Sequence, residues 1–179
     1  MKKLVGTLLM LSLSAAVFVG CNQQATTPDT PTGTSSAPAV DGSKYLLASE
    51  PDGVQDVIQV REAAQDQEEI VIVGRIGGRS NPWVEGRAAF SIVDGSLKAC
   101  SDIPGDECPQ PWDYCCETAK LPTSMALVKI LDTEGNLIKT DARQLLNVKE
   151  LQTVVVRGTA QRDEAGNLTV LASGVHVRK

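Results

Sequence analysis

The stretch Glu69-Ile70-Val71-Ile72-Val73-Gly74-Arg75-Ile76-Gly77 decides how this chain folds. Isoleucine and valine alternate through its centre, and β-branched residues of this kind favour strands. A glycine inside such a run indicates a bulge or a tight bend, as small barrels need, and Gly74 occupies that position. We therefore predict a strand over residues 69–77 with a bulge or bend at Gly74.

The sequence on both sides of this stretch continues the β pattern. Short apolar runs predict four more strands, over residues 89–94, 125–132, 153–160 and 168–177. Glycine and proline in residues 77–87 predict a long hairpin loop. A short helical pattern covers residues 141–148. A helix-start signal at residues 49–52 predicts an amphipathic helix that continues to about Glu69.

The predicted order of strand, strand, strand, helix, strand, strand resembles the OB-fold, the nucleic-acid-binding-type barrel. Residues 71–76 and 89–94 resemble the first hairpin of that family, and residues 154–160 resemble its fourth strand. The resemblance implies a mainly β domain over residues 44–179, a five-stranded OB-like Greek-key barrel. The helix before it is an addition at the N-terminal side. A Cys-rich insert, residues 97–123, separates strands two and three.

The first twenty residues have the pattern of a secretory signal peptide. Two lysines precede an apolar stretch over residues 4–19, which is short for a membrane-spanning helix. Phe18-Val19-Gly20-Cys21 then resembles the bacterial lipobox. The resemblance implies that residues 1–20 are removed and that Cys21 is lipidated. The alternative is an ordinary signal that precedes a cysteine by chance.

The segment 21–43 has the composition of a disordered tether. It is rich in Thr, Pro, Ser, Ala and Gly, and it holds too little apolar surface to offset the entropy of ordering. The resemblance to lipoproteins implies a lipid anchor in the bacterial cell envelope. Asn22 takes the place of the aspartate that retains enteric lipoproteins in the inner membrane, which favours the outer membrane, facing the periplasm.

The charge of the chain makes nucleic acid an unfavourable partner. The formal net charge is −5, and removing residues 1–20 takes away Lys2 and Lys3 but no acidic residue, which leaves −7. Such a charge opposes a polyanion, and no basic stripe alternates with aromatic residues. The barrel is instead predicted to bind another envelope ligand or protein. The candidate ligand-binding patch comprises Arg75, Arg79, Trp83, Arg87, Trp112 and Tyr114.

The four cysteines other than Cys21 fall within one short segment of the insert. They are Cys100, Cys108, Cys115 and Cys116, and a secreted protein meets oxidising conditions. Two disulfides are therefore one interpretation. Because a bond between the adjacent pair would be strained, the frameworks are Cys100–Cys115 with Cys108–Cys116, or Cys100–Cys116 with Cys108–Cys115.

A metal site is the second interpretation of the same four cysteines. Four sulfurs suit Zn or Cu(I), and with His176 the single histidine of the chain, a metal would rest almost wholly on sulfur. Thiol redox chemistry is a third interpretation, although the chain has no C-x-x-C motif.

Catalytic motifs do not identify an enzyme in this sequence. It contains no G-x-S-x-G, no H-E-x-x-H and no phosphate-binding loop. We expect a non-enzymatic envelope lipoprotein whose OB-like barrel is a binding or interaction module with a disulfide-stapled insert. The alternative is an envelope metal-handling protein with a four-cysteine Zn or Cu(I) site, and the third candidate is a thiol redox protein.

Overall fold

The computed structural model describes residues 40–179. The predicted signal peptide 1–20, Cys21 and the tether up to residue 39 lie outside these residues. At the end of the predicted tether, Gly42 is already packed, because a Cβ there would lie 1.6 Å from the backbone oxygen of Leu145. A 3-10 turn, η1, follows at Ser43–Tyr45.

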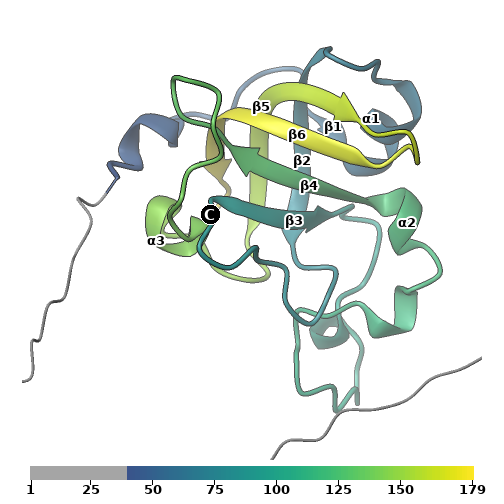
Figure 1. Ribbon diagram of the computed structural model, residues 1–179. Helices are drawn as coiled ribbons and strands as arrows, with labels where there is room; N and C mark the ends of the chain where they lie inside the picture. Colours follow the sequence, from purple (N-terminus) through teal and green to yellow (C-terminus); the bar gives the residue numbers. More distant parts are fainter. Residues whose placement is uncertain (1–39) are drawn as a thin grey trace, which may run out of the picture. The chain divides into compact units, whose positions relative to one another are not determined.

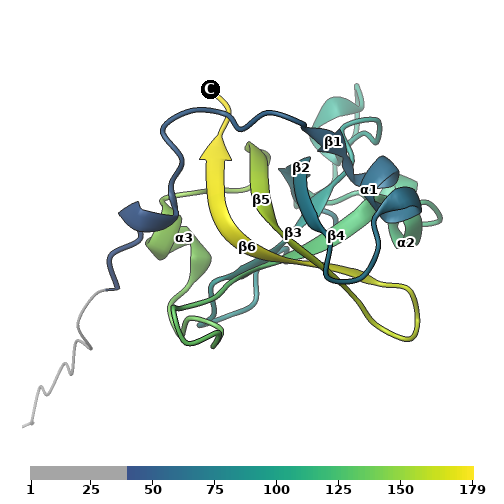
Figure 2. The same ribbon diagram turned by 90° about the horizontal axis from the view of Figure 1, so that it is seen from above.

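A closed barrel of five strands forms the centre of the described chain (Figures 1 and 2). Its strands are β2 (Glu69–Ile76), β3 (Ala89–Val93), β4 (Met125–Ile130), β5 (Thr153–Arg162) and β6 (Leu168–Val177). The strand order is β2-β3-β4-β6-β5, and pairing of β5 with β2 closes the circle. The pair β4 and β6 is parallel, whereas the other barrel pairs are antiparallel. This confirms the predicted mainly β, OB-like barrel.

One further strand, β1 (Gln55–Asp56), extends the sheet outside the barrel. It pairs in parallel with β2, with Gln55 opposite Ile72. No sequence pattern indicated this strand, because two exposed polar residues show no alternation of apolar and polar side chains.

Alternation along β4 separates the barrel interior from its outer face. Ala126, Val128 and Ile130 are buried in the main core. The residues that alternate with them, Met125, Leu127 and Lys129, are only half-buried. Successive side chains of a strand point to opposite faces, so these three lie on the outside of the barrel. The main core comprises side chains of all five barrel strands together with side chains from residues 57–64 and 142–148.

Gly74 does not form the predicted bulge. It pairs in regular register with Val154, and the register shift of the barrel lies instead between Arg157 and Gly158. Glycine is needed at position 74 for close packing, since a Cβ there would lie 2.9 Å from the Cβ of Ile92. Gly158 allows a still closer approach, with 2.3 Å from its Cβ position to the backbone oxygen of Leu171.

The first helix is shorter than predicted. Helix α1 covers Val57–Ala63 and not the whole stretch up to Glu69. It begins after β1, where the Asp56 backbone N–H donates to the Gln59 side chain. It ends at Ala64, whose backbone is extended, and Gln67 then takes a positive φ of 66°. Because Gln55 and Asp56 pair with β2 as strand β1, the helix begins only at Val57, later than predicted.

The second predicted helix is confirmed. Helix α3 covers Ala142–Leu146, and the Asp141 carboxylate accepts a hydrogen bond from the backbone N–H of Arg143. This is the N-cap arrangement that stabilises a helix start. The helix buries Leu145 and Leu146 in the main core and ends at Asn147, with φ of 53°.

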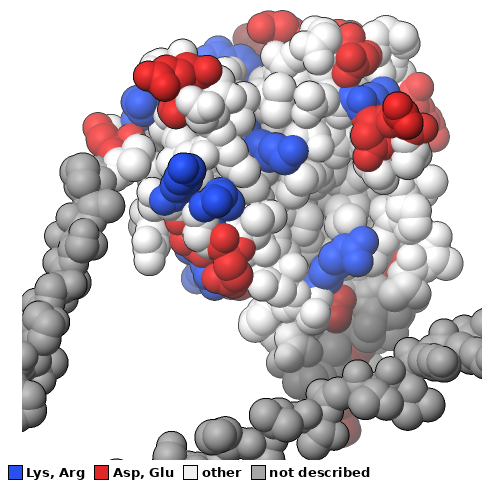
Figure 3. Space-filling view, viewed as in Figure 1, with Lys and Arg blue, Asp and Glu red and all other residues white. Residues whose placement is uncertain are grey.

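Basic and acidic side chains are interspersed on the face of the molecule shown in Figure 3. The lysine and arginine side chains form no continuous stripe on that face. None of the helices within residues 40–179 is long and apolar enough to cross a membrane.

Candidate metal centre

The Cys-rich insert lies between β3 and β4 and projects from one end of the barrel (Figure 1). It contains two 3-10 turns, η2 (Cys100–Asp102) and η3 (Cys115–Glu117), and the short helix α2 (Leu121–Ser124). A small second core holds the insert together. That core comprises Val93, Leu97, Ala99, Tyr114 and Leu121, with Met125 and Leu151 packed against it.

Backbone hydrogen bonds bring the two arms of the insert together. The N–H of Cys100 donates to the carbonyl of Asp113 at 2.8 Å, and the N–H of Ser101 donates to the carbonyl of Pro111 at 3.0 Å. These bonds place η2 beside η3. The insert is therefore ordered by its own backbone pairing, with no disulfide required for the approach.

Contacts with the end of β2 fix the insert on the barrel. A Cβ at Gly77 would lie 2.8 Å from the carbonyl oxygen of Trp112 and 2.9 Å from the Tyr114 ring. The Trp112 indole N–H donates to the carbonyl of Ser80 at 2.9 Å. Arg75 also forms an ion pair with Asp102 in η2.

Three sulfurs converge where the two arms meet. The sulfurs of Cys100, Cys108 and Cys115 all lie within 4.8 Å of one another. Four sulfurs around a tetrahedral metal, each about 2.3 Å from it, lie roughly 3.8 Å apart. The three sulfurs lie within 4.8 Å of one another, and those of Cys100 and Cys115 are 3.3 Å apart, so these cysteines are a donor set that could hold a metal ion.

Cys116 belongs to a second, overlapping donor set. It groups with Asp106 and Cys115, again within 4.8 Å, and its sulfur lies 3.9 Å from that of Cys115. The 3-10 turn η3 makes this possible, because it folds the backbone sharply at the two adjacent cysteines. The four cysteines therefore do not form one four-sulfur cluster, as the sequence suggested, but two sets that share Cys115.

The predicted disulfides are not present. All four cysteines are free, and the sulfurs of Cys100 and Cys115 are 3.3 Å apart, whereas a disulfide bond is about 2.05 Å long. Each predicted framework also needs Cys116 to pair with Cys100 or Cys108. Cys116 lies in the other donor set, so neither framework fits this arrangement.

The electrostatics of the cluster favour protonated thiols when no metal is bound. Burial raises the pKa of Cys100 to about 12, and contact with Cys115 adds to this effect. The contact with Cys100 lowers the pKa of Cys115, but contact with Cys116 and burial outweigh it, so that pKa is also raised. A metal must therefore displace protons from these sulfurs.

The sequence did not predict a direct role for Asp106 in the site. Its Oδ1 accepts the backbone N–H of Cys108 at 2.6 Å, and its Oδ2 lies 3.8 Å from the sulfur of Cys116. The signal in the sequence was the spacing of an aspartate two residues before a cysteine, which is typical of a side chain that accepts from the backbone. Asp106 thus positions one cysteine and faces another.

The six residues of the predicted ligand-binding patch do not share one surface. Arg75, Trp112 and Tyr114 take part in attaching the insert, and Tyr114 is almost fully buried, with its hydroxyl unpartnered among the described residues. Arg87 is exposed at the hairpin turn. Arg79 lines a cleft on the barrel.

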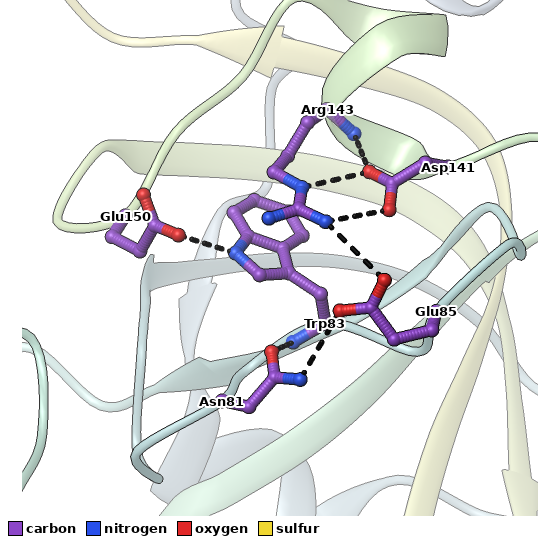
Figure 4. A network of polar contacts seen from close by, with 6 residues as sticks. All are labelled: Asn81, Trp83, Glu85, Asp141, Arg143 and Glu150. Atoms are coloured by element: carbon purple, nitrogen blue, oxygen red, sulfur yellow. Dashed lines mark hydrogen bonds and ion pairs between the residues drawn. The ribbon is translucent and has the colours of Figure 1, made fainter.

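Trp83 is held in a polar network (Figure 4). Its indole N–H donates to Glu150 at 2.5 Å, and the guanidinium of Arg143 lies 5.3 Å above its ring. Asp141 accepts two hydrogen bonds from that guanidinium, at 2.8 and 2.9 Å. With Trp83 6% exposed, the ring fixes the hairpin loop to α3 and offers little free surface for stacking.

A cleft of about 820 Å³ lies on the outer face of β4, and we call it the barrel-face cleft. Leu127 and Lys129 of β4 contribute to its lining, between the 77–87 loop and the turn that joins β5 to β6. Clefts that hold small molecules usually have volumes of about 300 to 1,000 Å³. Its size is therefore suited to a small ligand.

Comparisons with known proteins add little to this description. No family model matches the chain, and no curated protein matches it. Among solved structures, the barrel is similar to a "putative aspartyl-tRNA synthetase" from Leishmania major Friedlin, with 13% identity and a TM-score of 0.39. The match covers 79% of this chain and 22% of that protein, so the chain spans about a fifth of its length.

Proposed function

We propose that this protein binds a soft metal ion, Cu(I), through Cys100, Cys108 and Cys115. The observation that carries the proposal is the convergence of these three sulfurs within 4.8 Å on free cysteines. Thiolates are soft ligands, and soft ligands select Cu(I) and Zn over hard ions such as Mg²⁺. The donor set therefore defines the class of metal.

The number of sulfurs favours Cu(I) over Zn. Structural zinc sites are almost always four-coordinate, and this set offers three sulfurs. The single histidine is not available as the fourth ligand, because His176 lies on β6, where its Nδ1 is 3.1 Å from the carbonyl of Leu47. Cu(I) binds well to three thiolates and needs no fourth ligand.

The surroundings of the site favour a cation. Acidic residues of the insert lie close by in sequence, namely Asp102, Asp106, Glu107, Asp113 and Glu117. Of these, Asp102 is neutralised by Arg75 and Glu117 by Lys120. The remaining carboxylates attract a positive ion. They also raise the pKa of the thiols, as the charge of Asp106 does for Cys100, so the bound ion must offset this added cost of deprotonation.

The proposal places the metal site in the bacterial cell envelope, on a non-enzymatic lipoprotein. The signal-like residues 1–20 and the lipobox-like residues that end at Cys21 support this location. A lipid on Cys21 would attach the protein to the outer membrane, facing the periplasm. Mature protein that remains soluble and unacylated with Cys21 intact would refute the anchor without affecting the metal site.

The metal proposal is tested on the chain from Asn22 to Lys179, which keeps every described residue. The chain is purified anaerobically with reductant, titrated with Cu(I) in competition with bicinchoninate, and analysed for bound metal. We expect one Cu(I) per chain, and loss of binding in Cys100→Ser. A wild-type chain that stays metal-free, and that shows no free thiol in the insert when it is purified without reductant, would restore the disulfide hypothesis.

The barrel-face cleft supports a second candidate function, the binding of a small organic anion. Arg79 and Lys129 line it, and neither forms a salt bridge with a described residue. Leu127 and Met125 supply apolar surface beside them. The anionic apolar dye anilinonaphthalene sulfonate is a suitable probe. We expect Leu127→Trp, which places a bulky ring in the cleft, to weaken dye binding, whereas unchanged binding would exclude this site.

A further inference from the structure

Two donor sets share one cysteine, and they differ in exposure. Cys100 of the inner set is 2% exposed and Cys108 is half-buried. Cys116 of the outer set is exposed and Asp106 is half-buried. The shared residue, Cys115, is itself exposed. An ion that arrives from solvent therefore meets the outer set before it can reach Cys100.

We propose that Asp106, Cys115 and Cys116 form an entry position, from which Cu(I) passes to Cys100 and Cys108 by ligand exchange around Cys115. This inference rests on the proposed Cu(I) site and adds the route by which the ion enters it.

The sulfur distances suit such an exchange. Cys115 lies 3.9 Å from Cys116 on one side and 3.3 Å from Cys100 on the other. A Cu(I) ion held by the Cys115 sulfur can therefore replace one neighbour by the other with a small displacement. Cys115 keeps its bond to the ion throughout, so the metal is never released to water.

Asp106 is arranged to act at the entry position. Its Oδ1 is occupied by the backbone N–H of Cys108, which fixes the carboxylate, while its Oδ2 faces Cys116. A carboxylate is a weak ligand for a soft ion, and weak ligands exchange readily. Asp106 therefore attracts the cation without trapping it in the outer set.

The transfer needs no oxidant or reductant. The ion remains Cu(I), and no electron moves. As the ion advances, its bonds to Cys116 and to the Asp106 carboxylate break while bonds to Cys100 and Cys108 form. The two incoming thiols each release a proton, Cys116 takes one up again and Asp106 remains a carboxylate, so the net step releases one proton to solvent.

The test separates the rate of Cu(I) uptake from the equilibrium affinity. The Asn22–Lys179 chain is mixed anaerobically with the Cu(I)–bicinchoninate complex, and the loss of its absorbance is followed by stopped flow. We expect Cys116→Ser to keep one Cu(I) per chain and near wild-type affinity. Its uptake should be slower by about tenfold or more, equivalent to about 1.4 kcal/mol in the barrier.

A matched pair of variants isolates the carboxylate. Asp106→Asn and Glu107→Gln each remove one negative charge beside the site, but only Asp106 belongs to a donor set. We expect uptake to slow more in Asp106→Asn than in Glu107→Gln, because Glu107 contributes only general attraction for the cation whereas Asp106 also supplies a ligand atom. Equal slowing in the two variants would exclude Asp106 as a ligand of the entry position. Circular dichroism of each variant verifies that the barrel is folded.

Each other outcome has a distinct meaning. If Cys116→Ser loses affinity as strongly as Cys100→Ser, Cys116 is a ligand of the final site and the relay is wrong. If wild type binds Cu(I) but Cys116→Ser takes it up at the wild-type rate, the relay is also wrong and the metal site stands. If wild type binds no Cu(I), the proposed function itself fails.

Discussion

The sulfurs of Cys100 and Cys115 lie 3.3 Å apart, although Cys100 is buried and Cys115 is exposed to solvent. The two residues are brought together by backbone hydrogen bonds between the arms of the insert, including that from Cys100 to Asp113. One buried and one accessible thiol at this distance can share a metal ion or be oxidised together.

Oxidation of the metal-free chain is expected to join Cys100 to Cys115. The oxidant diamide removes two electrons and two protons from a thiol pair, and this pair has the shorter of the two sulfur–sulfur contacts in the cluster. Cleavage before aspartates separates Cys100, Cys108 and the adjacent pair into different peptides, so mass spectrometry identifies the link. Cys116→Ser should give the same product. A dominant link to Cys108 would contradict the prediction.

Alkaline pH is expected to destabilise the metal-free protein through Cys100. Its pKa is raised by burial from 9.0 to about 12, so the protonated thiol favours folding below the unfolded value. That contribution is lost as pH rises from 9.0 towards about 12. Urea unfolding of the reduced protein at about pH 8 and about pH 11 measures the free energy of unfolding. The decrease between the two pH values should be smaller in Cys100→Ser than in wild type. Equal decreases would show that a group other than Cys100 dominates the alkaline destabilisation.

Acid is expected to weaken the contact between Asp94 and α1. This buried carboxylate accepts the backbone N–H of Ile58 at 2.9 Å and two hydrogen bonds from Ser96. Burial alone would raise the pKa of Asp94, but these bonds outweigh it and hold the pKa below 3.8. The stabilisation is therefore present above the unfolded pKa and is lost as pH falls through the lower, folded value.

The variant Asp94→Asn tests this contact. We expect it to lower the free energy of unfolding by about 1–3 kcal/mol at neutral pH, because hydrogen bonds to a buried charge are lost or weakened. The difference from wild type should shrink as pH falls through the lowered pKa of Asp94, where the wild-type carboxylate becomes protonated as well. Chemical unfolding over a series of pH values from neutral to acid measures this difference. A difference that does not change with pH would contradict the ionic origin.

Gly77→Ala is expected to disturb the attachment of the insert. The added Cβ would lie 2.8 Å from the carbonyl of Trp112, a backbone atom that cannot move away without shifting the insert. We expect a loss of about 1–3 kcal/mol of stability, together with weaker Cu(I) binding. Gly95→Ala is the matched control, because a Cβ there meets no atom within 4 Å. Equal effects of both variants would exclude a role for this close approach.

Most of the barrel could be predicted because its strands carry local signals. The β-branched run of β2 and the alternating burial along β4 follow directly from residue type. The parallel pairing of β4 with β6 has no such local signal, because it joins strands that are far apart along the chain. The start of α1 was misplaced because β1 pairs with β2, a contact between residues far apart in sequence.

The candidate site was predicted in its residues but not in its arrangement. Clustering of four cysteines identified the insert as the site of interest. The division into two donor sets depends on the sharp turn at η3 and on the pairing of Cys100 with Asp113. The spacing of the cysteines in the sequence predicts neither the turn nor the backbone pairing. The residues of the candidate ligand-binding patch do not share one surface, because Trp83 and Tyr114 are buried in different cores.

The sequence by itself determined that this chain builds a small β-barrel and gathers its thiols in one insert, since strand propensity and cysteine clustering are local properties. Only the tertiary structure decided which sulfurs meet. Two arms of the insert, fixed by Gly77 and by the pair of Arg75 with Asp102, bring Cys100 to Cys115 and leave Cys116 outside with Asp106. Those distances arise from packing between segments that are distant along the chain.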